Sequence, residues 1–219
     1  MSSTLIQQKC RYGGAILNKG LTRTMNITGS EFSDNKADSG GVIYASDTTI
    51  NIDRSEFIMN RADIEGGAID IFCPLVAEVV SVRFSGSVFC NNKADNGGAI
   101  NARKVTVTIN NSDFTENRAE AGVLYISESN ILFSGNTTIA NNNGSLFLFN
   151  SEFNITQMGN VNITHNSSPK PPNGTTTHQQ GGAITSFQSR ISLYGTCTLM
   201  QNEAKNGGAI LATESMVNY

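Results

Sequence analysis

Charged residues recur at fixed places along this chain and could together form a ligand site. One acid stands three residues after each of four asparagines: Asp38, Asp63, Asp95 and Glu120. One basic residue stands two positions before each acid: Lys36, Arg61, Lys93 and Arg118. If the chain stacks these copies, the carboxylates line up in one column, as a Ca²⁺ site requires. The basic residues beside them could supply the base of a polysaccharide-cleaving site.

A purely structural interpretation explains the same residues. Like charges stacked one repeat apart repel each other, so a basic column beside an acidic column relieves both. An exposed pair contributes only about 0–1 kcal/mol. The charges also follow the repeat, whereas an active site breaks it, and the last copy carries Lys205 in the acidic place. We therefore predict no catalytic, metal or cofactor site and no enzymatic activity.

The other residue types that carry chemistry are sparse. His165 and His178 have no cysteine or acid at metal-ligand spacing, and because both flank one loop they support no Ser-His-Asp set. The glycine pairs lack the Lys-Ser/Thr of a phosphate loop. Tyr44 and Tyr125 are expected to point outward, where a ring could stack on a sugar, although scattered surface aromatics are ordinary.

The four cysteines are Cys10, Cys73, Cys90 and Cys197, and their spacings of 63, 17 and 107 match no zinc motif. Cys73 and Cys90 could meet on neighbouring repeats, but small buried or half-buried thiols are the better explanation.

The chain has 219 residues, a formal net charge of -3 and only 15% charged residues. The near-neutral balance argues against a nucleic-acid partner. No apolar run approaches the roughly 18 residues of a transmembrane helix, and the N-terminus has no signal-peptide core.

Pairs of adjacent glycines divide the chain at nearly even intervals. Six pairs occur: Gly13-Gly14, Gly40-Gly41, Gly66-Gly67, Gly97-Gly98, Gly181-Gly182 and Gly207-Gly208. Ala121-Gly122 and Asn143-Gly144 are degenerate copies, and with them successive intervals are 27, 26, 31, 24, 22, 38 and 26 residues. A period in the mid-twenties indicates a solenoid.

A second marker precedes the glycines, an apolar residue followed three places later by asparagine. Its copies are Phe32/Asn35, Phe57/Asn60, Phe89/Asn92, Phe114/Asn117, Ile139/Asn142, Ile163/Asn166 and Leu199/Asn202. Upstream lies an alternation typical of strands, such as Ile50-Asn51-Ile52. No window shows a sustained helical period, and the unit is shorter than a propeller blade of about 40 residues. We predict an all-β parallel β-helix of about eight coils.

The repeat assigns structural roles. Phe32, Phe57, Phe89 and Phe114 should stack as an aromatic core column, and a second apolar column should contain Ile43, Ile69, Ile100, Leu124, Ile184 and Ile210. Asn35, Asn60, Asn92, Asn117, Asn142 and Asn202 should form a ladder at a turn, where asparagine tolerates the left-handed conformation. The paired glycines should supply a bend with positive φ. One insertion lies near Cys73-Pro74-Leu75, and residues 167–180 form a second, flexible loop on a face that could bind.

The GGAI tetrapeptides at Gly13, Gly66, Gly97, Gly181 and Gly207, with GGVI at Gly40 and FxxN at the four phenylalanines, resemble the repeats of the chlamydial polymorphic outer membrane proteins. The resemblance covers nearly the whole chain. It implies a surface-displayed, right-handed β-helix that is often adhesive. The chain ends in mid-coil without a polar cap, so we expect residues 1–219 to be a single β-helix domain from a longer solenoid.

Eight Asn-x-Ser/Thr sequons begin at Asn26, Asn110, Asn136, Asn143, Asn154, Asn162, Asn166 and Asn173, a slight excess over composition. With the resemblance, they favour an extracellular or cell-surface location. We predict a right-handed, single-stranded, pectin-lyase-like β-helix that displays and binds glycan or surface-protein partners. Two alternatives are a pectin-lyase-like carbohydrate-active enzyme, which would need acids and a basic residue off the repeat, and an inert spacer of a larger protein.

Overall fold

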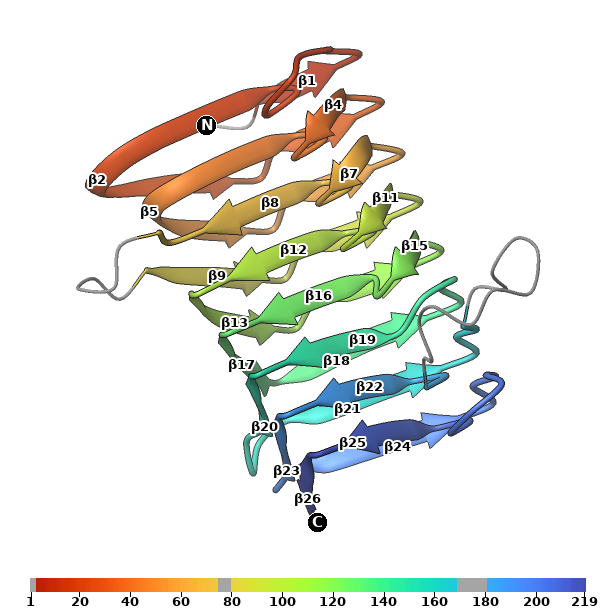
Figure 1. Cartoon of the computed structure of the whole chain (residues 1–219). Coiled ribbons are helices and arrows are strands. Elements are labelled where there is room, and N and C mark those ends of the chain that lie inside the picture. Colours follow the sequence, from red (N-terminus) through yellow and green to blue (C-terminus); the bar gives the residue numbers. More distant parts are fainter. Residues whose placement is uncertain (1–2, 75–79, 169–180) are drawn as a thin grey trace.

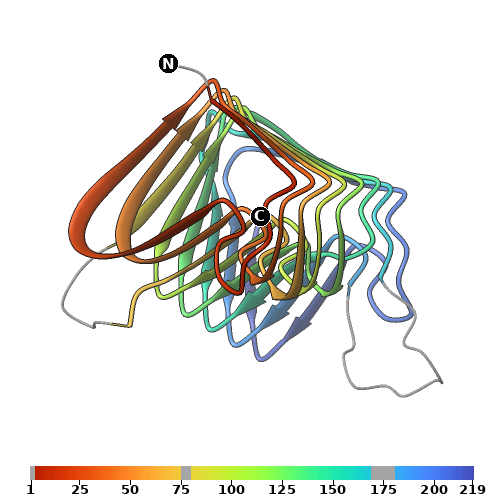
Figure 2. The ribbon, with the colours of Figure 1, turned by 90° about the horizontal axis from the view of Figure 1, so that it is seen from above.

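The fold is a parallel β-solenoid of about eight coils (Figure 1). The computed structural model describes residues 3–74, 80–168 and 181–219, and within these ranges every regular element is a strand. Seen from above, successive coils follow nearly the same outline (Figure 2). The predicted all-β solenoid is therefore confirmed, whereas handedness and the pectin-lyase-like class remain predictions.

Each coil has four faces, and the first two are separate sheets. Face 1 is the eight-stranded sheet that carries the phenylalanines: β1 (Thr4–Ile6), β3 (Glu31–Ser33), β6 (Glu56–Ile58), β10 (Val88–Cys90), β14 (Asp113–Thr115), β18 (Asn136–Ala140), β21 (Asn160–Thr164) and β24 (Thr196–Met200). Face 2 carries the charged pattern: β4 (Lys36–Ser39), β7 (Arg61–Glu65), β11 (Lys93–Asn96) and β15 (Arg118–Ala121).

Faces 3 and 4 are the two halves of one fourteen-stranded sheet, because the long strands β2 (Ile16–Thr28) and β5 (Ile43–Asp53) run through both. Face 3 continues with β8 (Ile69–Phe72), β12 (Ile100–Arg103), β16 (Leu124–Ser127), β19 (Leu146–Phe149), β22 (Ile184–Phe187) and β25 (Ile210–Thr213). Face 4 continues with β9 (Ser81–Ser85), β13 (Thr106–Asn110), β17 (Asn130–Ser134), β20 (Glu152–Ile155), β23 (Arg190–Leu193) and β26 (Met216–Asn218).

Residues with positive φ mark all four corners of the coil. At the corner between faces 1 and 2 the left-handed residue is the one before the ladder asparagine, as at Asp34, Met59 and Asn91. The ladder asparagines themselves do not have positive φ, although asparagine tolerates this conformation. The asparagine follows the bend and directs its amide inward, where it is buried.

The two glycines of each pair have different structural roles. Gly40, with φ 64°, makes the bend between faces 2 and 3, as Gly13, Gly66, Gly97 and Gly207 do. The second glycine of each pair does not have positive φ, so the prediction for the pairs is corrected at that position. A Cβ on Gly41 would lie 2.0 Å from the carbonyl oxygen of Gly67, so the second glycine is needed because neighbouring coils approach closely.

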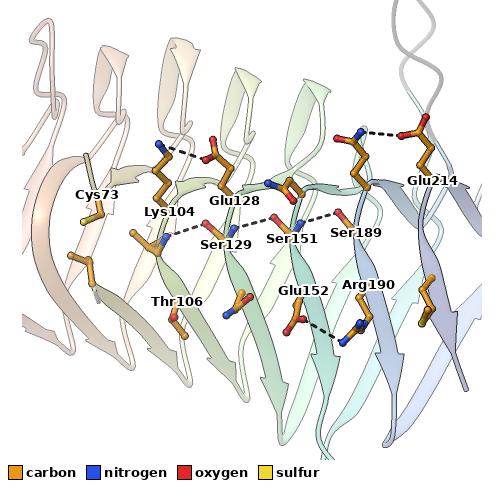
Figure 3. Close-up of a pocket in the computed structure, with 16 residues that line it drawn as sticks. Cys73, Lys104, Thr106, Glu128, Ser129, Ser151, Glu152, Ser189, Arg190 and Glu214 are labelled. Atoms are coloured by element: carbon orange, nitrogen blue, oxygen red, sulfur yellow. Dashed lines mark hydrogen bonds and ion pairs between the residues drawn. The ribbon is translucent and has the colours of Figure 1, made fainter. Parts of the chain in front are cut away.

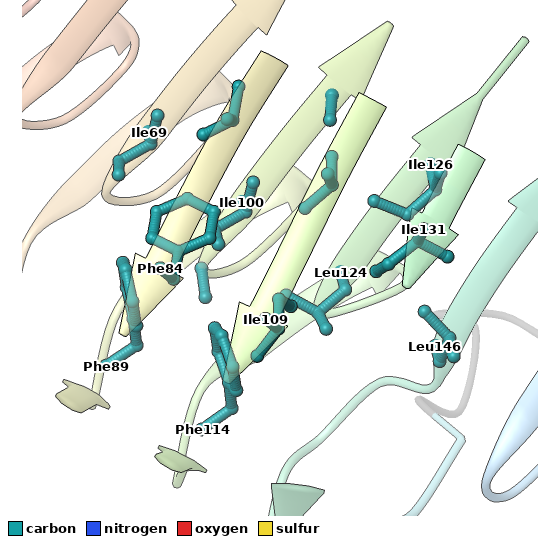
Figure 4. Close-up of a cluster of buried hydrophobic side chains, with 14 of the residues drawn as sticks. Ile69, Phe84, Phe89, Ile100, Ile109, Phe114, Leu124, Ile126, Ile131 and Leu146 are labelled. Atoms are coloured by element: carbon teal, nitrogen blue, oxygen red, sulfur yellow. The ribbon is translucent and has the colours of Figure 1, made fainter. Parts of the chain in front are cut away.

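The core is built from columns that run along the stack (Figure 4). Phe57 and Phe89 stack with ring centroids 4.7 Å apart and planes 3° from parallel, and Phe32 and Phe114 extend the column at 5.0 and 4.8 Å. Leu5 precedes this column, and Ile139, Ile163 and Leu199 follow it in register. Ile16 and Leu146 join the aliphatic column of face 3.

Two polar ladders accompany these columns. The asparagine ladder is one hydrogen-bonded chain from Asn35 to Asn202, and it includes Asn142 and Asn166. Serines form the second ladder. The main-chain N–H of Ser30 donates to Ser55 Oγ in the next coil, and the N–H groups of Ser55 and Ser87 donate in the same way to Ser87 and Ser112. Each ladder satisfies main-chain groups at a corner that the strands leave unpaired.

Candidate functional site

A polar groove runs along the outer surface of the corner between faces 3 and 4 (Figure 3). Its volume is about 860 Å³, and its lining reaches from Cys73 and Val80 to Glu214 and Met216. These residues belong to the third and eighth coils, so at about 4.8 Å per coil the groove is roughly 24 Å long. A site of this length and shape fits an extended chain better than a compact ligand.

Serines form the floor of the groove, and their hydroxyls are committed to the backbone. Ser151 Oγ accepts the main-chain N–H of Ser129 at 3.1 Å and donates to the carbonyl oxygen of Phe149 at 2.7 Å. Ser189 Oγ does the same one coil further, with the N–H of Ser151 and the carbonyl oxygen of Phe187. These hydroxyls fix the corner and are poorly placed to act as nucleophiles.

Two rows of polar side chains flank this floor. The row on the side of face 3 consists of left-handed residues: Lys104, Glu128, Asn150, Gln188 and Glu214. The row at the start of face 4 contains Thr106, Asn130, Glu152, Arg190 and Met216. Because the bend recurs in every coil at this corner, side chains of the first row lie beside one another at the coil spacing.

The charges in the groove largely neutralise one another. Lys104 Nζ lies 3.5 Å from Glu128 Oε2, and Arg190 Nη1 lies 3.6 Å from Glu152 Oε1. Gln188 Nε2 donates to Glu214 Oε2 at 2.9 Å. All four paired charges are about half exposed, so each pair contributes little stability and remains available to a ligand.

The predicted charged stripe lies on face 2, where Lys36, Arg61, Lys93 and Arg118 stand in register. Lys36 Nζ lies 3.5 Å and Arg61 Nε 3.2 Å from Asp63, and Arg11 pairs with Asp38 at 3.9 Å. These exposed ion pairs agree with mutual neutralisation. No group of three or more His, Cys, Asp or Glu side chains in the described parts of the chain could hold a metal ion.

The remaining candidate residues lie apart from one another. His165 is an exposed left-handed residue, and His178 lies outside the described residues, as do Asn173 and the predicted loop from position 169 onward. The four cysteines all lie in described segments and form no disulfide there. Burial raises the pKa of the Cys197 thiol to about 11.

The two outward tyrosines contact other rings rather than standing alone. Tyr44 lies 4.9 Å from Tyr12 between ring centroids, and Tyr125 stacks on Phe147 at 4.8 Å. Among the sequons, Asn26 and Asn136 are exposed and Asn110 is half-buried. Asn166 is 1% exposed because it belongs to the asparagine ladder.

Sequence reasoning missed a polar cluster that breaks the repeat on face 3. Asp70 and Asn101 are completely buried in the positions that Tyr44 and Tyr125 occupy in neighbouring coils. Arg103 connects this pair to Glu65 of face 2. A carbohydrate-active enzyme would need an acid and a basic residue off the repeat, and the sequence pattern did not reveal that Asp70 and Arg103 are such a pair. The signal was the aspartate directly after the GGAI at Gly66, and only the stacking register shows that it meets Asn101.

The Asp70 carboxylate is enclosed rather than open to a substrate. Its environment raises its pKa to about 6, chiefly through burial, with Glu65 adding to the effect and Arg103 and Asn101 opposing it. A buried acid with a raised pKa is a common feature of catalytic sites. Here, however, no oxygen of Asp70 reaches solvent, so a substrate could not contact it in this structure.

Comparison with protein-family models finds a match to the Chlamydia polymorphic membrane protein repeat at residues 29–46 and 86–103. Each matched stretch runs from a face 4–face 1 corner through the asparagine ladder and the glycine pair into face 3. Neither the curated proteins nor the solved structures include a significant match. Within the described residues, no helix is long and apolar enough to span a membrane.

Proposed function

Because two of its coils match the repeat of chlamydial polymorphic membrane proteins, we propose that this chain is an adhesive region on an outer cell surface that binds an extended glycan. The match itself suggests a surface-associated, autotransporter-like repeat region. Adhesion, the glycan ligand and the extracellular location are the parts that we add. The groove along the corner between faces 3 and 4 is the observation that carries them.

The side chains of the groove suit a neutral, polyhydroxylated ligand. Asn130, Asn150 and Gln188 supply amides that can donate and accept hydrogen bonds. Three carboxylates face two cations in the lining, which leaves a balance of only -1. A strongly anionic polymer would therefore find little net attraction, whereas sugar hydroxyls could bond to both the amides and the paired charges.

A peptide partner fits the groove less well. Peptides commonly bind by adding a strand to an open sheet edge or by placing apolar side chains in pockets. Inside the groove the main-chain groups of the floor are already bonded between coils, as at Val105, Ser129 and Ser151. Its large apolar side chains are few, with Met216 at one end and Val80 and Val105 near the other. We propose no enzymatic activity, because the serine hydroxyls of the floor are committed to the backbone.

The test is a glycan and extracellular-matrix array probed with the purified chain, with and without Ca²⁺. We expect binding to neutral glycans that is unchanged by chelation. An Asn130→Ala/Glu152→Ala variant should bind on the order of tenfold more weakly, because it loses two hydrogen-bonding groups. Asn154→Ala is the matched control, since Asn154 lies on the same strand as Glu152 but outside the groove lining.

Two outcomes would overturn the proposal. One is binding that survives unchanged in the groove variant while the control behaves as the parent. The other is recognition of matrix proteins alone, which would replace the glycan with a protein partner. Silence across the whole array would favour an inert spacer.

A further inference from the structure

Asp70 is a buried carboxylate whose hydrogen bonding is incomplete. Asn101 Nδ2 donates to Asp70 Oδ1 at 2.8 Å, but Asp70 Oδ2 has no hydrogen-bond partner. Asn101 Oδ1 and Arg103 Nε are likewise buried without a partner. An unsatisfied buried polar atom costs about as much as a lost hydrogen bond, so a cluster of three calls for an explanation.

The one nearby cation is committed to a different acid. Arg103 Nη2 lies 3.0 Å from Glu65 Oε2, and Nη1 donates to Glu65 Oε1 at 3.3 Å, which makes a two-point contact. The distance from Arg103 Nη2 to Asp70 Oδ1 is 3.7 Å. Glu65 therefore holds the guanidinium, and Asp70 is left only partly neutralised inside the protein.

The other groups that face Asp70 cannot neutralise it. Tyr44 of β5 and Tyr125 of β16 occupy the same outward column on either side of the Asp70–Asn101 pair. Burial raises the pKa of both phenols, and both remain neutral at physiological pH. Asn101 is uncharged, so Arg103 is the only cation and Glu65 the only other anion among these groups.

We propose that Glu65, Asp70, Asn101 and Arg103 form a proton-sensitive clasp between the third and fourth coils, in which Asp70 takes up one proton from solvent and leaves Arg103 wholly to Glu65. The proton bonds to a carboxylate oxygen and removes the buried negative charge. It also gives the cluster a donor, and Asn101 Oδ1 is an acceptor that lacks one. The clasp should therefore tighten as the medium becomes acidic.

The direction of the pH effect follows from linkage. The pKa of Asp70 is about 6 in the folded chain against an ordinary value of 3.8. The stabilisation from the bound proton is fully present below pH 3.8 and is lost as the pH rises through about 6. Within this window the contribution of Asp70 to the folding equilibrium should fall by about tenfold per pH unit.

The first experiment follows the side-chain carboxyl ¹³C resonances of the whole chain by NMR from pH 3 to 8, with Asp70→Asn to assign the Asp70 signal. We expect Asp70 to titrate near pH 6, and Glu65→Gln and Arg103→Gln to move its midpoint in opposite directions. Removing Glu65 should lower the midpoint because a repelling charge is lost. Removing Arg103 should raise it because an attracting charge is lost.

The second experiment measures denaturant unfolding of the parent and of Asp70→Asn across the same pH range. The ratio of the variant's folding equilibrium constant to that of the parent should rise roughly a hundredfold from pH 4 to pH 7. Asp53→Asn, at a partly exposed acid paired with Arg54, is the control and should show no such gain. An Asp70 midpoint near 4, or midpoint shifts of the same sign in Glu65→Gln and Arg103→Gln, would overturn the clasp. If Arg103→Gln does not fold, the Asp70 midpoint and the Glu65→Gln shift decide the question.

Discussion

Asn92 and Asn117 stand one coil apart and share a single carbonyl oxygen. Asn117 Oδ1 accepts the main-chain N–H of Asn92 at 2.9 Å and its side-chain Nδ2 at 3.0 Å. The second hydrogen of Asn92 Nδ2 goes to the carbonyl oxygen of Phe57 at 2.8 Å. Asn92 thus bonds to the coils on both sides of it, which a hydroxyl or a carboxylate could not do with the same donors.

Asn92→Ala should lower the free energy of unfolding by about 1–3 kcal/mol, because buried main-chain groups lose their partners. Thermal and denaturant unfolding would measure the change. Asn26→Ala is the control, since Asn26 is exposed and its contact with Asn51 is at the surface. Equal melting temperatures for Asn92→Ala and the control would show that the ladder does not stabilise the stack.

Gly67→Ala should be among the most damaging single changes in the chain. The added Cβ would lie 1.9 Å from the carbonyl oxygen of Gly98, so the backbones of two coils would have to separate. We expect a loss above about 3 kcal/mol, or failure to fold. Gly29→Ala is the matched control, because Gly29 has φ 55° but an added Cβ there would meet no atom within 4 Å. It should lower the free energy of unfolding by about 1 kcal/mol. A smaller loss in Gly67→Ala than in Gly29→Ala would contradict the close approach of the coils.

Glycosylation should distinguish two sequons that look alike in sequence. When the chain is secreted from a eukaryotic host, glycopeptide mass spectrometry of the folded protein should find a glycan on the exposed Asn136 and none on Asn166. A glycan on Asn166 would displace an amide that bonds to Asn202 and to Ile139. Ser168→Ala removes that sequon and should leave the yield unchanged, and folded protein with an occupied Asn166 would refute the assignment.

The cysteines should react with alkylating reagents in a fixed order. Cys10 is exposed, whereas burial raises the pKa of Cys197 to about 11, so little thiolate forms there at neutral pH. Timed labelling with iodoacetamide at pH 8, read by mass spectrometry, should modify Cys10 first. The Cys197 rate should still be rising between pH 9 and 11, and a plateau below pH 9 would contradict the assignment.

The repeat unit could be predicted from the sequence because it is defined by the spacing of residues that are close together in the chain. Inward and outward positions alternate along each strand, so Phe89 and Ile100 could be assigned to the core from the pattern alone, and both are buried. The glycine pairs and the asparagines marked the corners for the same reason. The groove could not be found this way, since its lining comes from six coils and, apart from the serines of its floor, its residue types vary from coil to coil.

The predicted charged stripe shows the limit of reasoning by repeats. Asp63 was visible because it recurs, and recurrence made it part of the architecture, paired with Lys36 and Arg61. Asp70 was overlooked because it occurs once.

The sequence by itself determined the solenoid, the length of its coil and the residues that stack inside it, because these depend on periodic spacing. Tertiary structure alone decided which residues meet across coils: Asp70 with Asn101, 31 positions apart, and Arg103 with Glu65, 38 positions apart. Inserted residues change the separation between equivalent positions from coil to coil, so a contact between coils follows the register of hydrogen-bonded strands and not any fixed interval in the sequence.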